Sequence, residues 1–472
     1  MSSTTDTQIK NRETICAPAT PRGRSALGMV RITGSNAINI LSEIFVNSKG
    51  QKSGVRRFMH AKVKHGYILD AKEEIVDEVV CVVFKAPKSF TGEDLVEISH
   101  HGSVYVQQQI LLSILAKGGR IATNGEFSQR AFINGKMDLS QAEAVADLIS
   151  AKTAMAHKLA MQQLRGGYKL TIKKLRECLV KILSLMELEL DFSEEDVEFA
   201  DRSELEMLLN ISIRELNQLV NSFKAGNSFK NGIPVAIIGK PNSGKSTLLN
   251  RILNEERSIV SSVSGTTRDT IEESMQIDGL EFRFIDTAGI RQTKNNIETK
   301  GIERSYKAVE RAEIVLYVCD ITKTDTLTAQ KDLLALDKHV SLTDKKIFVL
   351  ANKIDLVELT NSDKKEWDKL KAIQLSASTG LGIGELLQKI VLSSGKDEYE
   401  SNVLVTNVRH YEIMMKTLAA LLVAKESLEA GQPTDIIVSD IREAIHYIGE
   451  ITGVVTTDEI LNNIFSKFCI GK

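Results

Sequence analysis

The spacing of apolar positions over residues 25–135 is that of a small domain that combines strands and helices. Apolar residues recur at every second position or in short continuous runs, which is typical of strands, and a helical spacing appears between them. The strand-like runs are 28–32, 79–84 and 95–98, and a helical pattern begins at Asn36. These segments predict a small α/β or α+β domain.

From Leu139 onward the apolar positions follow a helical period, with an interruption at Gly166 and Gly167. Steps of three and four residues place one apolar stripe along a helix, with charged residues on the opposite face. The stripe consists of Ile172, Leu175, Leu179, Ile182, Met186 and Leu190. We expect this stripe to lie in the core of a helical bundle. Helical periodicity returns after Val405 and continues to the end.

A Gly-rich loop follows the apolar strand 234–238. It runs from Gly239 to Ser246 as GKPNSGKS and matches G-x-x-x-x-G-K-[ST] in full. The N–H groups of such a loop wrap a phosphate at the start of a helix, its lysine reaches the β and γ oxygens, and its serine ligates Mg²⁺. Chance would produce this match in about one chain in a hundred of this length. The loop therefore predicts a phosphate site with Lys245 and Ser246 in these roles.

A second motif, Asn352-Lys353-Ile354-Asp355, follows the apolar strand 347–351. Ligands of open α/β sheets bind at this carboxyl edge. A carboxylate at Asp355 can accept two hydrogen bonds from the N1–H and 2-amino groups of guanine, whereas adenine offers neither donor. After the strand 373–375, we expect Ser376-Ala377 to present a backbone N–H to the guanine O6. Alone, this tetrapeptide would indicate a solvated loop, but its spacing behind the phosphate loop favours guanine recognition.

Between these motifs lie two candidate sensors of the γ-phosphate. Asp286 would hold Mg²⁺ through its water shell, the Gly289 N–H would contact the γ-phosphate, and Thr267 would complete the metal's octahedron. The residues assigned to GTP are Asn242, Ser243, Gly244, Lys245, Ser246, Thr247, Ser261, Ser262, Val263, Ser264, Gly265, Thr266, Thr267, Asp286, Thr287, Ala288, Gly289, Asn352, Lys353, Asp355, Ser376, Ala377 and Ser378. We expect Ser246 and Thr267 to be the protein-derived Mg²⁺ ligands.

Ras-like switches place a Gln directly after D-x-x-G to orient the attacking water, and here that position is Ile290. An isoleucine side chain can neither donate nor accept a hydrogen bond. Arg291, Glu298 and Asn242 are the nearby alternatives, and Asn242 offers a carbonyl oxygen suited to a monovalent cation. From its position alone, Glu298 is better interpreted as part of a solvated helix face.

Composition and charge limit which partners and which cellular compartment the sequence favours. The 472 residues include 60 Lys and Arg against 62 Asp and Glu, so overall charge does not indicate a nucleic-acid partner. Five scattered cysteines without a C-x-x-C pair fit a reducing cytosol. The start shows no secretory signal and no apolar run approaches about 18 residues, so we expect a cytoplasmic protein without a membrane partner.

The pattern predicts a multidomain α/β protein with a Ras-like P-loop G domain inserted into a discontinuous helical bundle. The expected parts are an N-terminal domain (1–135), the first part of the helical domain (136–231), the G domain (232–394) and the second part of the helical domain (395–472). Asp278-Gly279 is a hairpin signal within the G domain. Such an insertion requires close chain ends and lets the nucleotide state move one body against another.

Seven short motifs outside the G domain are more specific than those within it. They are 19–23 (ATPRG), 30–34 (VRITG), 90–94 (FTGED), 125–128 (GEFS), 131–136 (AFINGK), 449–453 (GEITG) and 468–472 (FCIGK). With these marks the chain resembles, over essentially its whole length, the bacterial tRNA-modifying GTPases called MnmE or TrmE. Ser25 departs from the family, whose members usually carry Gly there.

The resemblance implies an enzyme that works with an FAD-dependent partner on tRNA. Together they would add an aminomethyl-type group, such as carboxymethylaminomethyl, to C5 of the wobble uridine. A 5-formyl- or methylene-tetrahydrofolate would supply the one-carbon unit, bound by an N-terminal domain that is similar to tetrahydrofolate-binding domains and dimerises. The positions that match the family's folate contacts are Arg31, Glu97, Lys136 and Lys472, and Cys469 matches a cysteine linked to the modification chemistry.

The resemblance also implies GTP hydrolysis that is activated by K⁺ and by pairing of G domains in a homodimer. Asn242 matches the family's K⁺-binding asparagine, with Ser261, Val263 and Thr266 completing that site. Glu298 matches the family's water-positioning glutamate, which reverses the interpretation from its position alone. Lys245, Glu298 and Cys469 are thus the candidate catalytic residues. The alternatives are a ribosome-assembly GTPase switch, for which no RNA-binding module is evident, and a membrane-remodelling GTPase, which lacks a lipid-binding element.

Overall fold

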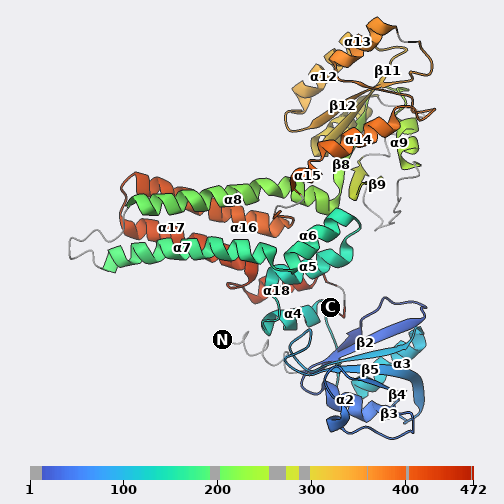
Figure 1. Cartoon of the computed structure of the whole chain (residues 1–472), viewed down its shortest axis with the longest axis vertical. Coiled ribbons are helices and arrows are strands. Elements are labelled where there is room, and N and C mark those ends of the chain that lie inside the picture. Colours follow the sequence, from blue (N-terminus) through green and yellow to red (C-terminus); the bar gives the residue numbers. More distant parts are fainter. Residues whose placement is uncertain are drawn as a thin grey trace. The chain divides into compact units, whose positions relative to one another are not determined.

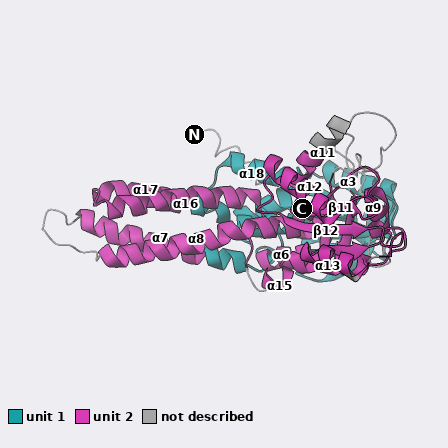
Figure 2. Ribbon diagram, turned by 90° about the horizontal axis from the view of Figure 1, so that it is seen from above, with its two compact units in different colours: residues 1–146, 164–172, 446–472 teal, residues 147–163, 173–445 magenta. Residues whose placement is uncertain are grey.

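The computed structural model describes residues 13–191, 202–254, 273–285, 298–358, 360–399, 403–468 and 470–471. The chain divides into two compact units (Figure 2). Unit 1 comprises 1–146, 164–172 and 446–472, and unit 2 comprises 147–163 and 173–445.

Unit 1 is built on a seven-stranded sheet with the order β3-β4-β5-β6-β2-β1-β7 (Figure 1). Its strands are β1 (Ile15–Pro18), β2 (Leu27–Thr33), β3 (Phe45–Asn47), β4 (Val63–Leu69), β5 (Ile75–Phe84), β6 (Leu95–His101) and β7 (Arg120–Ile121). Neighbouring strands are antiparallel except for β1 and β7. Of the two arrangements left open by the apolar pattern, α+β therefore describes this domain.

Two helices cover one face of this sheet. They are α2 (Ala37–Ile44) and α3 (Val104–Ala116), and a short 3-10 turn, η1 (Val55–Arg57), also belongs to this region. Alternate residues of the strands, such as Val30, Val83 and Ile98, share a core with Leu41 of α2 and Ile110 of α3. The other residues of β2 and β6 point to the opposite face, because successive strand side chains alternate.

The remaining helices of unit 1 come from both ends of the chain. They are α4 (Glu126–Ile133), α5 (Leu139–Ser150, to Ala146 in this unit) and α18 (Asp458–Phe465). Leu139 of α5 packs with Leu461 and Phe465 of α18 in a small core. The C-terminal helix thereby closes a core whose other residues lie more than three hundred positions earlier, and one hydrogen bond in this region spans 342 positions.

The helical part of unit 2 is a bundle. Its long helices are α7 (Gly167–Asp191, from Lys173 in this unit), α8 (Arg202–Asn231), α16 (Val408–Glu429) and α17 (Thr434–Thr452, to Ile445 in this unit), and the shorter α6 (Ala154–Leu164, to Gln163 in this unit) precedes them. In both ribbon views α7, α8, α16 and α17 run side by side (Figures 1 and 2). The predicted stripe of α7 is confirmed, since its residues from Ile172 to Met186 are buried and Leu190 is half-buried. The predicted break is also confirmed, because α7 begins at Gly167.

The sheet of unit 2 has six strands in the order β13-β12-β11-β8-β10-β9. Its strands are β8 (Ile233–Ile238), β9 (Glu273–Ile277), β10 (Leu280–Phe284), β11 (Ile314–Asp320), β12 (Lys346–Asn352) and β13 (Ile373–Leu375). All neighbours are parallel except β9 and β10, which form the hairpin expected at Asp278-Gly279. Both turn residues have positive φ, 49° and 77°, as a type I′ turn requires.

Helices cover both faces of this sheet, as in doubly wound α/β folds. They are α9 (Lys245–Leu253), α11 (Glu298–Arg311), α12 (Thr326–His339), α13 (Asn361–Lys369), α14 (Ile383–Ser393) and the short α15 (Lys396–Tyr399). Helices α9 and α14 share one core with the sheet, and α11, α12 and α13 share the other. The loops after β8, β12 and β13 consequently meet at one edge, where ligands of such sheets bind.

Candidate functional site

The phosphate loop lies between β8 and α9 and depends on two glycines with positive φ. Gly239 has φ of 144° and Gly244 has φ of 102°. A Cβ at Gly239 would lie 2.3 Å from Val318 O, and one at Gly244 would lie 2.2 Å from the Asn352 side-chain nitrogen. Any other residue would therefore push the loop away from β11 and β12. Helix α9 begins directly after Gly244, so its first N–H groups face the loop.

The side chain of Lys245 folds back onto the phosphate loop, and its ammonium group is hydrogen-bonded to the backbone of that loop. Lys245 Nζ donates hydrogen bonds to Gly239 O and Lys240 O, both at 2.8 Å. Burial lowers the pKa of Lys245. An anion beside the ammonium would offset that effect, because an opposite charge favours the protonated form. Ser246, the proposed Mg²⁺ ligand, is half-buried in the first turn of α9.

Asn352, at the end of β12, joins the phosphate loop to the loop after β13. Its side-chain nitrogen donates to Ser243 O at 2.8 Å, and its side-chain oxygen accepts from Ala377 N at 2.9 Å. The side chain is buried, so both hydrogen bonds are shielded from water. The sequence places Asn352 in the nucleotide site, and the structure shows how it fixes two of the loops there.

Lys353 adds a link from the phosphate loop to the end of β11. Its backbone has positive φ, 74°, and its ammonium donates to Asn242 O at 2.9 Å and to Asp320 Oδ2 at 2.6 Å. Burial alone would raise the pKa of Asp320, but hydrogen bonds from Lys353 and Thr322 outweigh it and lower that pKa. Asp320 is therefore an ionised group of the site that motif reasoning missed. The available signal was an acid directly after the apolar run 314–319.

The proposed guanine-selecting carboxylate is exposed and ionised. Hydrogen bonding from Ser376 lowers the pKa of Asp355, and Ser378 Oγ donates to its Oδ2 at 3.1 Å. The two amides proposed for guanine O6 already have partners, because Ser376 N donates to Leu381 O and Ala377 N donates to Asn352. A contact with O6 would require sharing of the Ala377 N–H, and it stays a prediction.

Arg251 is a second residue that sequence reasoning missed. It lies on α9, and its guanidinium donates to the carbonyl oxygens of Ala377 and Ser378. The helix that follows the phosphate loop thus also holds the loop that carries the proposed base-contacting residues. No motif marks an arginine in the last turn of a helix for such a role.

Part of the predicted nucleotide and modification site lies outside the described residues. These positions are Ser261, Ser262, Val263, Ser264, Gly265, Thr266, Thr267, Asp286, Thr287, Ala288, Gly289, Cys469 and Lys472. Glu298 begins α11, but its side chain also lies outside the described part. Their roles stay predictions. Of the other predicted GTP residues, Asn242 and Thr247 are exposed at the loop and at the first turn of α9.

In unit 1, the structure brings Arg31 and Glu97 together. They are direct register partners on β2 and β6, and Arg31 Nε donates to Glu97 Oε1 at 2.8 Å. The guanidinium also lies 5.9 Å from the centre of the Phe90 ring. Lys136 donates to Pro87 O at 3.0 Å and is exposed. Three of the residues matched to folate contacts are therefore associated with strands β2 and β6 and with the segment 86–94.

Two family models match this chain, one over its N-terminal part and one over most of the remainder. A model of the MnmE helical domain matches residues 139–469, and a model of the GTP-binding protein TrmE N-terminus matches residues 14–136. The chain belongs to the MnmE family. The match to this family extends over both units, and it includes the fold elements that carry Arg31 and Asn352.

Curated MnmE relatives match nearly the entire chain. The tRNA modification GTPase MnmE of Flavobacterium psychrophilum is 46% identical over 98% of this chain and 99% of its own length. The relative from Parabacteroides distasonis is 46% identical over 97% and 100%, and that from Cytophaga hutchinsonii is 45% identical over 99% and 100%. Within the described residues, no helix has the length and apolar character needed to cross a membrane.

Proposed function

We propose that this protein hydrolyses GTP to drive the modification of a wobble uridine in tRNA. The observation that carries the nucleotide part is the Asn352 side chain, which bonds both the phosphate loop and the loop after β13. Those two bonds connect the phosphate-binding and base-binding elements in one rigid arrangement. Membership of the MnmE family supports GTP hydrolysis and a role in tRNA modification.

Guanine is the base that fits this arrangement. Asp355 is ionised and exposed, and Ser378 orients its carboxylate. An ionised carboxylate accepts hydrogen bonds and cannot donate any, so it pairs with the N1–H and 2-amino group of guanine. Adenine would leave the charge without a partner, which is a strong basis for discrimination.

The phosphate loop fits a polyphosphate with Mg²⁺. Within the described residues the buried hydroxyl of Ser243 has no hydrogen-bond partner, and the glycines on either side leave no space for a Cβ. Both features suit a loop that wraps an oxyanion. Ser246 and Thr267 would ligate Mg²⁺, which shields charge on the phosphates, while Lys245 neutralises the β and γ oxygens.

Hydrolysis would depend on Glu298 and on a cation at Asn242. Glu298 would orient the attacking water in place of the glutamine that Ile290 replaces. Asn242 lies exposed in the phosphate loop with φ of 60°, and an amide oxygen there suits K⁺. With Ser261, Val263 and Thr266, it would hold a positive charge where other GTPases use an arginine finger, once two G domains pair in a homodimer.

The folate and the modification chemistry belong to unit 1. Its tetrahydrofolate-binding-like domain offers one carboxylate, Glu97, for the N–H groups of a pterin, and cations at Arg31, Lys136 and Lys472 for the folate carboxylates. The folate would supply the one-carbon unit, and an FAD-dependent partner would supply redox chemistry. We assign Cys469 to the modification step, because a thiolate is nucleophilic and a cation beside a thiol generally favours the thiolate form.

We also propose the domain division 1–135, 136–231, 232–394 and 395–472, with the G domain inserted into the helical domain, and a cytoplasmic location.

The test of the function is mass spectrometry of wobble uridines from cells that lack the protein and express single variants. Wild type should restore the modified uridine, whereas Lys245→Ala and Cys469→Ser should not. Cys469→Ser should keep GTP hydrolysis, which separates the two activities.

Two results would contradict the proposal. Normal wobble uridines in the deletion strain, accompanied by defective ribosomal subunits, would favour the ribosome-assembly switch. Equal GTP turnover in KCl and NaCl at matched ionic strength, at several protein concentrations, would refute activation by K⁺ and by G-domain pairing.

A further inference from the structure

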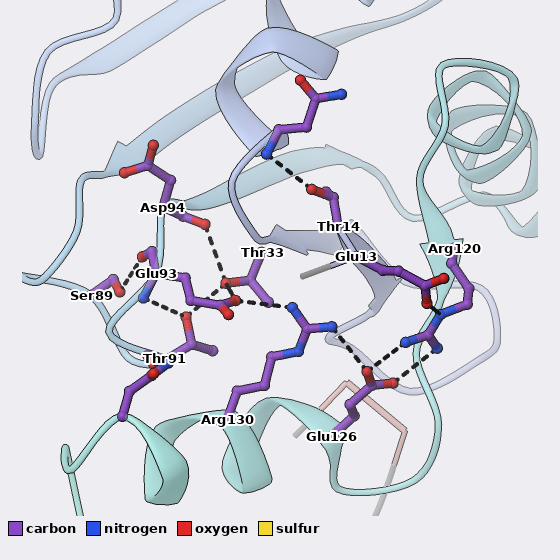
Figure 3. A network of polar contacts seen from close by, with 12 residues as sticks. Glu13, Thr14, Thr33, Ser89, Thr91, Glu93, Asp94, Arg120, Glu126 and Arg130 are labelled. Carbon is purple, nitrogen blue, oxygen red and sulfur yellow. Dashed lines mark hydrogen bonds and ion pairs between the residues drawn. The ribbon is translucent and has the colours of Figure 1, made fainter. Parts of the chain in front are cut away.

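A chain of ion pairs runs through unit 1 from the first described residue to the segment 90–94 (Figure 3). We call Glu13, Arg120, Glu126, Arg130 and Glu93 the charged network. Arg120 bonds Glu13 at 2.6 Å and Glu126 at 2.7 Å, and Arg130 bonds Glu126 at 3.0 Å and Glu93 at 3.1 Å. The two arginines share the Glu126 carboxylate, so the network is continuous.

The centre of the charged network is buried. The Arg130 side chain is 1% exposed and that of Glu126 is 9% exposed. Removing two charges from water is costly, and well-packed apolar residues of the same volume often serve stability equally well. A buried pair can instead fix one arrangement of the chain. The segments that the network positions therefore indicate its role better than its contribution to stability does.

One end of the network positions the segment 90–94. Glu93 accepts hydrogen bonds from Arg130 and from Thr33 Oγ1, and Thr33 also bonds Thr91 Oγ1 at 2.7 Å. Thr91 O accepts from Asn134, on the turn just before Lys136. This segment includes Phe90, which lies beside the Arg31 guanidinium. The orientation of Glu93 thus affects the surroundings of two residues proposed to bind folate.

The centre of the network, at Glu126, positions the C-terminal segment. Glu126 accepts from Thr123 N at 2.9 Å and from Thr123 Oγ1 at 3.2 Å, which fixes the turn 123–125. In that turn the Asn124 side chain donates to Ser466 O at 3.2 Å, and a Cβ at Gly125 would lie 2.5 Å from Phe465 O. The segment at Phe465 leads along the chain to Cys469 and Lys472.

We infer that Arg130 and Glu126 are positioning residues that hold the segment 90–94 and the C-terminal segment 465–468 in one mutual geometry. Neither residue needs to contact the ligand. Arg130 has the fork that reaches Glu93 and Glu126 together, and Glu126 couples that fork to the turn 123–125. This inference rests on the proposed folate function of unit 1, because the network joins the two segments that lie next to residues proposed for that function.

The experiment compares Arg130→Met, Arg130→Lys and the control Lys52→Met in the full-length protein. Lys52 pairs with Glu73 at 2.6 Å on the surface of the same domain, so its loss removes an exposed ion pair only. We would titrate 5-formyl-tetrahydrofolate by calorimetry and follow hydrogen exchange in peptides covering 88–95 and 460–468. GTP turnover reports on unit 2 as a further control.

Arg130→Met should weaken folate binding by about ten- to a hundredfold, the range known for outer-shell partners of bound metals. Exchange should accelerate in both peptides, although they are remote in sequence. Arg130→Lys should fail to restore binding, because an ammonium cannot form the same fork. Lys52→Met and the GTP turnover of all variants should stay unchanged. If Arg130→Met does not fold, Glu93→Gln tests the same link at a side chain that is 19% exposed.

Three outcomes would overturn the inference. Unchanged folate affinity in Arg130→Met, exchange that accelerates in only one of the two peptides, or full rescue by Arg130→Lys would each show that the fork does not position the site. A wild type without folate affinity would refute the folate proposal, whereas coupled exchange in that case would still support the link between the two segments.

Discussion

The Asn352 side chain gives a quantitative test of how the nucleotide site is held together. Asn352→Ala removes the hydrogen bonds to Ser243 O and Ala377 N without altering any group that contacts the γ-phosphate. Ser243 and Ala377 are both buried, so water cannot fully replace the lost partner. The substitution should therefore loosen the phosphate loop and the loop after β13 together.

The expected size follows from the two bonds. Each buried backbone group left without a partner costs about 1–3 kcal/mol. Part of this cost also destabilises the protein without nucleotide and does not affect binding. If about 1–2 kcal/mol appears in the binding free energy, the Kd rises by about 5- to 30-fold. GDP and GTP should be affected equally, because neither bond lies at the γ-phosphate.

The assay is equilibrium titration with fluorescent GDP and a fluorescent non-hydrolysable GTP analogue. The matched control is Asn250→Ala, which removes the same side chain from the exposed face of α9. Unchanged affinity in Asn352→Ala would refute the role of this side chain as the link between the loops. A loss confined to the GTP analogue would refute the reasoning as well, since it would place the effect at the γ-phosphate.

Three further substitutions test separate parts of the molecule. Asp355→Asn should shift preference from guanine towards xanthine, whose 2-oxo group needs a donor, and competition binding with both nucleotides would detect a failure of this shift. Burial alone would raise the pKa of Glu126, but Arg120, the Thr123 N–H and Arg130 lower it below the ordinary 4.5. Its stabilising effect is therefore complete above that pH and is lost as the pH falls through the lower folded value, so Glu126→Gln should flatten the decline of the melting temperature in acid. Glu298→Ala should slow single-turnover GTP hydrolysis in K⁺ by about 10²–10⁴-fold at unchanged affinity, and an unchanged rate would return Glu298 to a solvated helix face.

The sequence allowed prediction of features that depend on local spacing. The apolar stripe of α7, the hairpin at Asp278-Gly279 and the strand before the phosphate loop each follow from a short-range pattern. Short strands with little pattern were missed, as with β1 and the two-residue β7. Their place in the sheet depends on pairing with distant segments, which apolar spacing does not encode.

The candidate sites divide in the same way. Motif spacing identified Lys245 and Asp355, but the partners that hold these loops, Asp320 and Arg251, carry no motif of their own. The charged network was also not foreseen, because Arg130 lies on a helix and its partner Glu93 lies 37 positions away. Such pairs become visible only when the fold brings their segments together.

The packing of α8 against α16 has a consequence for the order of events on the ribosome. Val405 N donates to Ser222 Oγ across 183 positions of sequence, and the entire six-stranded sheet is encoded between them. At about 5–20 residues per second, the apolar face of α8 waits about 10–40 s for its partner helix. In unit 1 the core beneath α5 waits longer still, because Leu461 and Phe465 emerge after almost all other residues. Interrupted translation consequently leaves both units without part of their cores, and such truncated chains expose apolar surface that chaperones and proteases recognise.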